Sequence, residues 1–304
     1  MCESFRARPG TDILQTRLEK QSRATILHNK SLYFRSQTCR DKPMRIAVVL
    51  LCLLACNPKA LAQAVAPVLP PGSGWSLGVV SVVREGIYAG EDFQTRIVPG
   101  IGYEGDRFFI RGLSGGVKLA GGDRVEIDAL AKWSFGAERE DFSDRELAAN
   151  GVVPEHVEGR NGVLEAGVSI RARTAAGEIT LQALTAVLGS YDGAEASLVW
   201  GYPVRAGPVR ITPEAYLTYV SEGKADYWFG FLPSEIARGA PDYQPGAYMT
   251  GGAGLRFFSP LSRRWSMFGQ LRYEAVPDAV RSSPLTARLP DASVSGIIGI
   301  QRSF

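Results

Sequence analysis

The residue types that most often carry out chemistry are sparse in this 304-residue chain. His156 is the one histidine after residue 62, and no nucleophile motif surrounds it that would use a general base. The carboxylates Glu138, Glu140 and Asp141 belong to the same long segment, but groupings of this kind are expected wherever acids are common. One histidine also cannot build a multi-histidine metal site. We therefore predict a non-enzymatic protein without a metal or cofactor.

Cysteine and charge divide the chain near residue 62. All four cysteines (Cys2, Cys39, Cys52 and Cys56) precede that point. A long cysteine-free body is typical of a compartment in which stray thiols would be oxidised. Residues 1–62 carry a net charge of +7, so the remainder carries −4 within the total of +3. The basic pI therefore comes from the front end, and we expect no nucleic acid partner for the rest.

An export signal explains this division. Met44-Arg45 is a short basic start, residues 46–55 are apolar, and Ala60 and Ala62 frame a cleavage site. We predict a signal peptide over 44–62 and interpret residues 1–43 as an upstream extension. Residues 63–74 then form a Pro-rich periplasmic leader. Leu53-Leu54-Ala55-Cys56 resembles a lipobox, so lipidation at Cys56 stays as the alternative.

From residue 75 onward the hydrophobic pattern alternates with a period of two, which is typical of strands with one apolar and one polar face. Short turn signals and longer polar gaps alternate between these segments, as in an outer-membrane barrel with short periplasmic turns and long external loops. The pattern predicts an all-β, antiparallel transmembrane β-barrel over 75–304. Twelve strands keep every short turn on the periplasmic side, provided that Ser114-Gly115-Gly116 form a tight external turn; ten strands are the alternative.

The alternation also divides the side chains between two walls. One wall carries charges of both signs, which we expect to face the lumen and either brace it or select solutes: Glu126, Asp128, Lys132, Glu165, Arg171, Arg173, Arg210, Glu214, Arg272 and Glu274. The other wall carries aromatics near both strand ends, as expected for residues at the headgroup levels of a bilayer. A soluble barrel would reverse the two walls, but these aromatics, the terminal Phe304 and the length favour a membrane barrel whose outer surface contacts lipid.

Four ordered stretches make the chain resemble the outer-membrane MipA/OmpV family, the MltA-interacting proteins. They are Gly86 to Asp92 running on to Pro99, Tyr103 to Gly112, Ala225 to Gly230 with Ser234 to Tyr243, and Tyr273 through Ser283-Pro284-Leu285 to Phe304. The chain departs from the expected pattern at Trp228-Phe229 and at Arg302. The terminal Phe304 looks like the C-terminal signal of outer-membrane barrels.

The resemblance implies an outer-membrane scaffold that joins a lytic transglycosylase to a peptidoglycan synthase; a small diffusion pore or an adhesin is the alternative. No binding residue carries over from the family. Within the chain, the aromatic segment with Tyr227, Trp228, Phe229 and Tyr243 could anchor a partner or fold inward as a plug.

Overall fold

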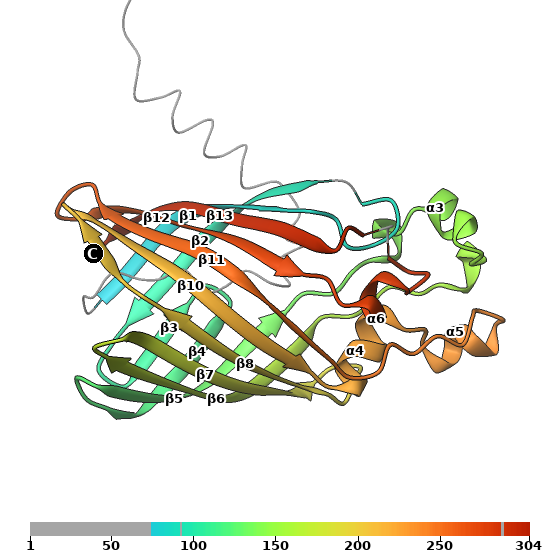
Figure 1. Cartoon of the computed structure of the whole chain (residues 1–304), viewed down its shortest axis with the longest axis horizontal. Coiled ribbons are helices and arrows are strands. Elements are labelled where there is room, and N and C mark those ends of the chain that lie inside the picture. The colour runs from blue at the N-terminus through green and yellow to red at the C-terminus, as the bar shows by residue number, and fades with distance from the viewer. Residues whose placement is uncertain (1–73, 92, 287–288) are drawn as a thin grey trace, which may run out of the picture. The chain divides into compact units, whose positions relative to one another are not determined.

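The alternating segments form one antiparallel sheet that closes on itself in the computed structural model, which describes residues 74–91, 93–286 and 289–304 (Figure 1). Consecutive strands pair with one another except β8 and β9, which both pair with β10, and β1 pairs with β13 to close the barrel. The strands are β1 (Gly74–Arg84), β2 (Gln94–Glu104), β3 (Phe108–Arg111), β4 (Ser114–Gly121), β5 (Val125–Ser134), β6 (Val163–Thr174), β7 (Gly177–Leu188), β8 (Ala194–Gly201), β9 (Val204–Ala206), β10 (Val209–Val220), β11 (Tyr248–Pro260), β12 (Trp265–Ala275) and β13 (Ala292–Ser303).

The prediction of twelve strands is confirmed, and the alternative of ten is wrong. The short segments β8 and β9 both pair with β10 and are separated only by Tyr202 and Pro203. They are one strand of the barrel with a local break, which fits proline's lack of a backbone N–H for the ladder.

The predicted tight turn at Ser114-Gly115-Gly116 is wrong. The hairpin between β3 and β4 turns at Gly112 and Leu113, and Arg111 already pairs with Ser114. Gly112 has a φ of +63°, a left-handed conformation that glycine adopts without a steric penalty. Gly116 instead provides space, because a Cβ there would lie 2.3 Å from the Ala129 carbonyl oxygen.

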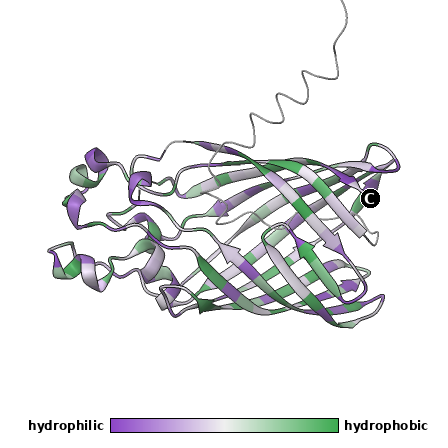
Figure 2. Ribbon diagram, turned by 180° about the vertical axis from the view of Figure 1, so that it is seen from behind, coloured by the Kyte–Doolittle hydropathy of each residue, from purple (hydrophilic) through white to green (hydrophobic). Residues whose placement is uncertain are grey.

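Hydrophobic and hydrophilic residues follow one another along the strands of the barrel (Figure 2). Large apolar side chains stand exposed along its outside, among them Leu77, Ile97, Ile101, Leu181, Leu198, Leu217, Leu255, Leu271 and Ile298. Aromatic side chains including Trp133, Tyr219, Tyr273, Tyr202 and Trp265 are exposed as well. An apolar outer surface on a closed sheet suits a lipid environment, since the paired strands satisfy their backbone hydrogen bonds within the protein.

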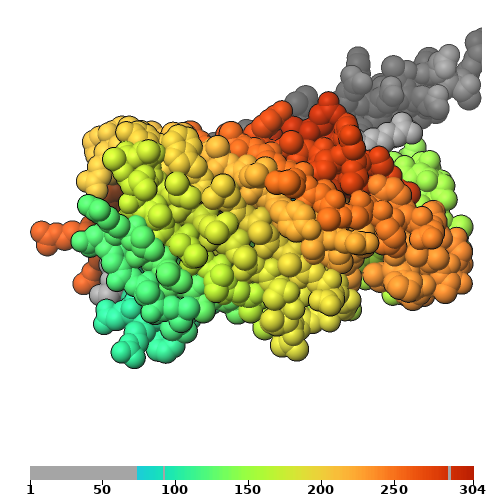
Figure 3. Space-filling view, turned by 60° about the horizontal axis from the view of Figure 1, so that its bottom comes forward, coloured from blue at the N-terminus to red at the C-terminus, as the bar shows by residue number. Residues whose placement is uncertain are grey.

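The long loops fold into a cap at one end of the barrel, opposite the C-terminus (Figure 1). Short helices build it: η2 (Arg139–Asp141), α3 (Asp144–Ala149), η3 (Pro154–His156), α4 (Glu222–Phe229), α5 (Pro233–Ala237) and α6 (Asp278–Arg281). The cap has its own hydrophobic core, which joins residues from four different loops: Tyr88, Ala89, Ala137, Phe142, Leu147, Val152, Val157, Phe231, Ala240 and Leu285. Figure 3 shows the orange part of this cap, at the right, as a solid mass continuous with the strands.

Within the described residues, no helix has the length and apolar character needed to cross a membrane. The expected upstream extension, the signal peptide with Ala60 and Ala62, Cys56 and almost all of the leader lie outside the described residues.

Candidate functional site: a charged lumen beneath a folded cap

The barrel encloses a cavity of about 1160 Å³. Of the residues that alternation assigned to the lumen, nine line this cavity: Glu126, Asp128, Lys132, Arg171, Arg173, Arg210, Glu214, Arg272 and Glu274. The tenth, Glu165, is fully buried and does not contribute to the cavity surface. The lining runs from Tyr88 and α4 at the cap to Asp106 and Pro203 near the opposite strand ends.

Charges on β3 to β7 form an interlocked ladder along one side of the lumen. Glu126 pairs in register with Arg171 across β5 and β6, and its Oε1 lies 3.1 Å from the Arg171 Nη1. Arg111 binds Glu104 with its Nε and Nη2 and approaches Asp128 at 3.7 Å. Side chains opposite each other on one face of a sheet are within reach, so the pleat itself aligns these partners.

The wall formed by β10 to β12 is organised differently. Glu214 accepts a hydrogen bond from Gln270 at 2.8 Å and also pairs with Arg256. The guanidinium of Arg272 lies 4.5 Å above the Tyr216 ring, and that of Arg210 lies 5.5 Å from the Phe258 ring centre. Throughout the described part of the chain, no carboxylate forms an ion pair with Arg210 or Arg272, and the buried Nε of Arg272 has no hydrogen-bond partner.

An apolar strip completes the lumen. Val80, Val98 and Phe268 form a buried cluster with Val82, Phe258 and Ile297, on strands β1, β2 and β11 to β13. Val82, Phe258 and Ile297 of this strip also line the cavity. The lumen is therefore amphipathic across its width, with a charged ladder on one side and the apolar strip on the other.

Helix α4 forms the cap side of the cavity. Its Lys224, Trp228 and Phe229 line the cavity. The Tyr88 hydroxyl donates to the Trp228 carbonyl and the Ser283 hydroxyl to that of Phe229, so loops from two other parts of the chain hold the helix.

Lys224 fixes α4 to the barrel wall through two carboxylates. Its Nζ lies 2.6 Å from Glu165 Oε1 and 2.7 Å from Glu195 Oε2. Ser134 and Tyr191 donate further hydrogen bonds to Glu165. Burial alone lowers the pKa of Lys224, but the Glu195 and Glu165 charges more than offset this, and the net pKa lies above its ordinary value. Burial has the opposite effect on the neighbouring tyrosine hydroxyl and raises the pKa of Tyr191.

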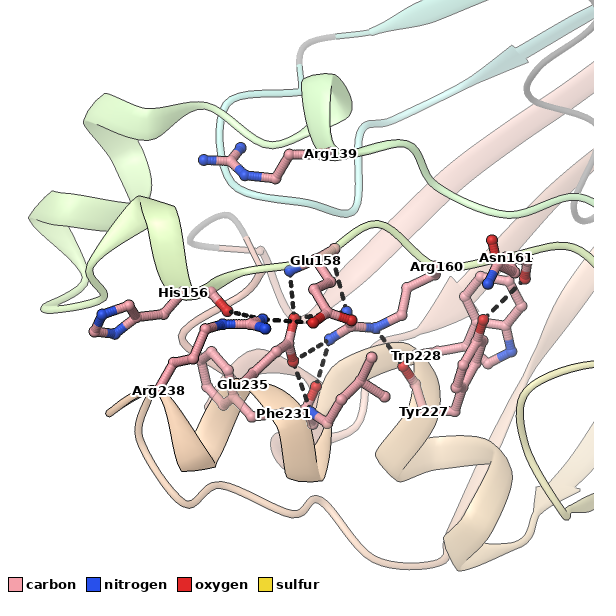
Figure 4. A network of polar contacts seen from close by, with 12 residues as sticks. Arg139, His156, Glu158, Arg160, Asn161, Tyr227, Trp228, Phe231, Glu235 and Arg238 are labelled. Atoms are coloured by element: carbon pink, nitrogen blue, oxygen red, sulfur yellow. Dashed lines mark hydrogen bonds and ion pairs between the residues drawn. The ribbon is translucent and has the colours of Figure 1, made fainter.

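A second buried ion pair joins two loops of the cap (Figure 4). Arg160 Nη1 and Nη2 lie 2.9 and 3.1 Å from the two oxygens of Glu235, and both side chains are completely buried. The guanidinium also donates to the carbonyls of Tyr227, Gly230 and Glu158. Glu235 accepts backbone N–H bonds from Glu158 and Leu232, so this pair fixes three chain segments at once.

The aromatic loop candidates occupy different places in this cap. Tyr227 is buried and its hydroxyl donates to the Asn161 carbonyl, whereas Trp228 and Phe229 line the cavity. The Tyr243 hydroxyl donates to the Ala279 carbonyl, and its ring packs against the cap core. The structure thus brings this group inward rather than presenting it as one exposed patch.

His156 lies in η3, beside Gly239. Its carbonyl accepts a hydrogen bond from Arg238, and no ion pair to its ring occurs within the described residues. In the same part of the chain, no three His, Cys, Asp or Glu side chains come together as a group able to hold a metal.

The C-terminal residue is tied to the first strand. The Phe304 N–H donates to the Trp75 carbonyl, and the Arg302 guanidinium lies 4.9 Å from the Phe304 ring centre. The ring itself remains exposed at the end of the barrel opposite the cap.

The contacts of Arg160, Glu235 and Lys224 were missing from the sequence interpretation. Glu235 follows Pro233 at a helix start, where an acid often caps the first turn. Nothing local marks Arg160 as its partner, because the two residues lie 75 positions apart.

Comparison with known proteins identifies the family. The sequence model described as MltA-interacting protein MipA matches residues 77–304. The MltA-interacting protein of Escherichia coli (strain K12) is 29% identical over 238 residues, covering 76% of this chain and 90% of that protein. YiaT of Escherichia coli O157:H7, provisionally described as an outer membrane protein, is 24% identical over 234 residues, covering 75% of this chain and 90% of its own.

Among solved structures, the NanC porin aligns with a TM-score of 0.41 and 9% identity, covering 75% of this chain and 100% of that chain. An outer membrane channel from Pseudomonas putida F1 aligns with a TM-score of 0.40 and 11% identity, covering 80% and 99%. With its closed twelve-stranded barrel and its match over residues 77–304, the chain belongs to the MltA-interacting protein MipA family of outer-membrane proteins.

Proposed function

We propose that the protein is a non-enzymatic scaffold in the outer membrane that holds a lytic transglycosylase together with a peptidoglycan synthase. The observation that carries this proposal is the name of its relative, MltA-interacting protein, at 29% identity over most of both chains. Export by a signal peptide cleaved after Ala62 belongs to the same proposal, since the enzymes that remodel the cell wall act in the periplasm.

The periplasmic end of the barrel offers the surface for such partners. Its turns expose five arginines and two aspartates: Arg107, Arg124, Arg205, Arg263, Arg264, Asp106 and Asp123. A basic surface of this kind favours partners with a complementary acidic face, and it steers them in a salt-dependent manner. The leader, residues 63–74, leads into β1 in the sequence and is the second candidate contact.

Reversing charge on one periplasmic turn tests the scaffold. We expect the variant carrying Arg263→Glu and Arg264→Glu to bind a purified lytic transglycosylase about tenfold more weakly than the unaltered protein, because two cations would become anions. Pull-down and surface plasmon resonance at two salt concentrations measure this, and a chain lacking residues 63–74 is compared in parallel.

Arg145→Glu on the exposed surface of α3 serves as the control, since it reverses one arginine charge at the external end. Weakening by the control to the same extent, or no binding by the unaltered protein, would contradict the proposal.

A small diffusion pore is the second candidate, supported by the 1160 Å³ cavity and its charged lining. Single-channel conductance in planar bilayers distinguishes the two functions. If neither the unaltered protein nor a variant whose α4 is detached from the barrel wall shows channel events, the protein is not a diffusion pore.

A further inference from the structure

The barrel wall is incomplete between β2 and β5. Strand β3 has four residues and pairs with only three residues of β2, Gly102 to Glu104. Among the described residues, no strand therefore pairs with residues 94–100 of β2 on that side, which is about 20 Å of strand. On the other flank, β4 begins opposite Lys132, so β5 extends beyond its neighbour at Trp133.

The backbone groups on this free edge can be assigned. Gly112 N–H donates to the Ile101 carbonyl and Gly105 N–H to the Phe108 carbonyl, so odd-numbered residues of β2 direct their polar groups toward β3. Thr95, Ile97 and Pro99 continue that series where β3 is absent. Proline at position 99 removes one of the N–H donors that would otherwise be unpaired, which is how natural proteins blunt a free edge.

We define the wall window by its four borders. Residues 95–99 of β2 form one side, the Gly112–Leu113 turn the base, and Trp133 with Phe135 the other side. The cap closes it above, where the Ser143 N–H donates to the Ala89 carbonyl.

The cavity reaches the wall window. Leu113, Trp133 and Phe135 line the cavity, although Trp133 belongs to the outer, lipid-facing series of β5 and is 41% exposed. Lumen and outer surface thus share a side chain at this border. A free sheet edge facing hydrocarbon would leave polar groups unsatisfied, a cost of several kcal/mol for each group, so the edge requires water or a polar ligand beside it.

Inside the window, an apolar surface of the lumen is adjoined by a cationic one. Val82, Ile297 and Phe258 present an apolar strip to the cavity. The guanidinium of Arg210 lies over Phe258, and Arg272 lies on the same group of strands. Within the described residues neither forms an ion pair, and the nearby Glu274 accepts a hydrogen bond from the Tyr216 hydroxyl. Both cations can therefore attract an anion toward the apolar surface, although the charge of Glu274 partly offsets that of Arg272.

We propose that the wall window is a lateral portal through which a small anionic amphiphile, such as a medium-chain carboxylate, passes between the outer leaflet and the lumen. Its chain lies along Val82, Ile297 and Phe258, and its head faces the part of the lumen wall that carries Arg210 and Arg272. This role is separate from the proposed scaffold, since it uses the lumen and the wall window and no residue of the periplasmic turns.

Equilibrium binding tests the head-group site. The full chain in detergent is titrated with 11-(dansylamino)undecanoic acid and, separately, with its uncharged methyl ester. We expect saturable binding of the acid, weakened about tenfold or more by Arg272→Gln and by Arg210→Gln, because each removes a charge-assisted contact. Binding of the ester should not change. Arg263→Gln in a periplasmic turn is the control, and heat-dependent gel mobility verifies that each variant keeps its barrel.

Transfer kinetics test the portal. Inserting Thr-Val before Gly112 and again after Leu113 lengthens the β3–β4 hairpin so that it can pair with the free edge of β2. In vesicles preloaded with the acid, we expect transfer into the lumen to slow about tenfold while the affinity in detergent stays the same. The same insertion around Ala175 and Ala176 is the control. Equal slowing by the control, equal affinity for acid and ester, or no saturable binding would overturn the proposal.

Discussion

Replacing Arg160 by methionine should release the external cap while the barrel stays folded. The substitution removes all five donors that bind Glu235 and three carbonyls, and it leaves the Glu235 carboxylate buried without its cation. Removing one member of a buried ion pair costs about 3–5 kcal/mol, because the remaining charge has lost its compensation. The cap rests on this pair and on a core of modest size, so a loss of this magnitude should open it.

Limited proteolysis of reconstituted protein measures the effect. We expect cleavage in residues 135–162 and 221–247 to become at least about a hundredfold faster for Arg160→Met, with unchanged heat-dependent gel mobility of the barrel. Arg238→Gln is the matched control, since it breaks a neighbouring pair with Glu158 that is partly exposed, and exposed pairs contribute about 0–1 kcal/mol. Equal resistance of Arg160→Met and the unaltered protein would show that the cap does not depend on this pair.

The sequence predicts the barrel well because the information is local. Val125, Ile127 and Ala129 alternate with Glu126 and Asp128, and the pleat alone sends them to opposite walls. The same alternation identifies the residues that line the cavity, because a lumen residue needs only the correct parity.

The features that the sequence did not predict depend on contacts between residues far apart in the chain. Glu165 has lumen parity, but α4 covers it, and its partner Lys224 lies 59 positions away. The β3–β4 turn lies at Gly112 rather than at residues 114–116, because Gly116 accommodates the neighbouring Phe109 ring and strand β5. The wall window follows from the length of one short strand, and alternation carries no information on where a strand stops.

Two buried sets of ion pairs hold the cap, and each makes a different connection. Arg160 and Glu235 join loops to one another, whereas Lys224 joins the cap to the barrel wall through Glu165 and Glu195. Each can therefore be removed separately, and the consequences should differ: the first change loosens the cap, and the second frees the helix over the cavity.

Replacing Lys224 by methionine should detach α4 from the wall. Glu165 would keep only Lys132 at 3.7 Å and two neutral donors, and Glu195 would lose its ion pair. We expect a local loss of about 3 kcal/mol, seen as frequent channel openings in planar bilayers where the unaltered protein stays closed. Adding Glu165→Gln removes the uncompensated charge and should recover part of the loss, whereas Glu222→Gln, on the same helix, is the matched control.

The pH dependence follows from the sign of the Lys224 shift. Because its pKa in the folded protein lies above the ordinary value of about 10.4, the stabilisation is complete below that pH and disappears as the pH rises through the folded pKa. The unaltered protein should therefore stay closed between about pH 6 and about pH 9. It should begin to open only under strongly alkaline conditions. Lys224→Met should show no such alkaline transition. If both proteins have the same conductance over the whole pH range, α4 is held by its backbone contacts to Tyr88 and Ser283 and not by its lysine.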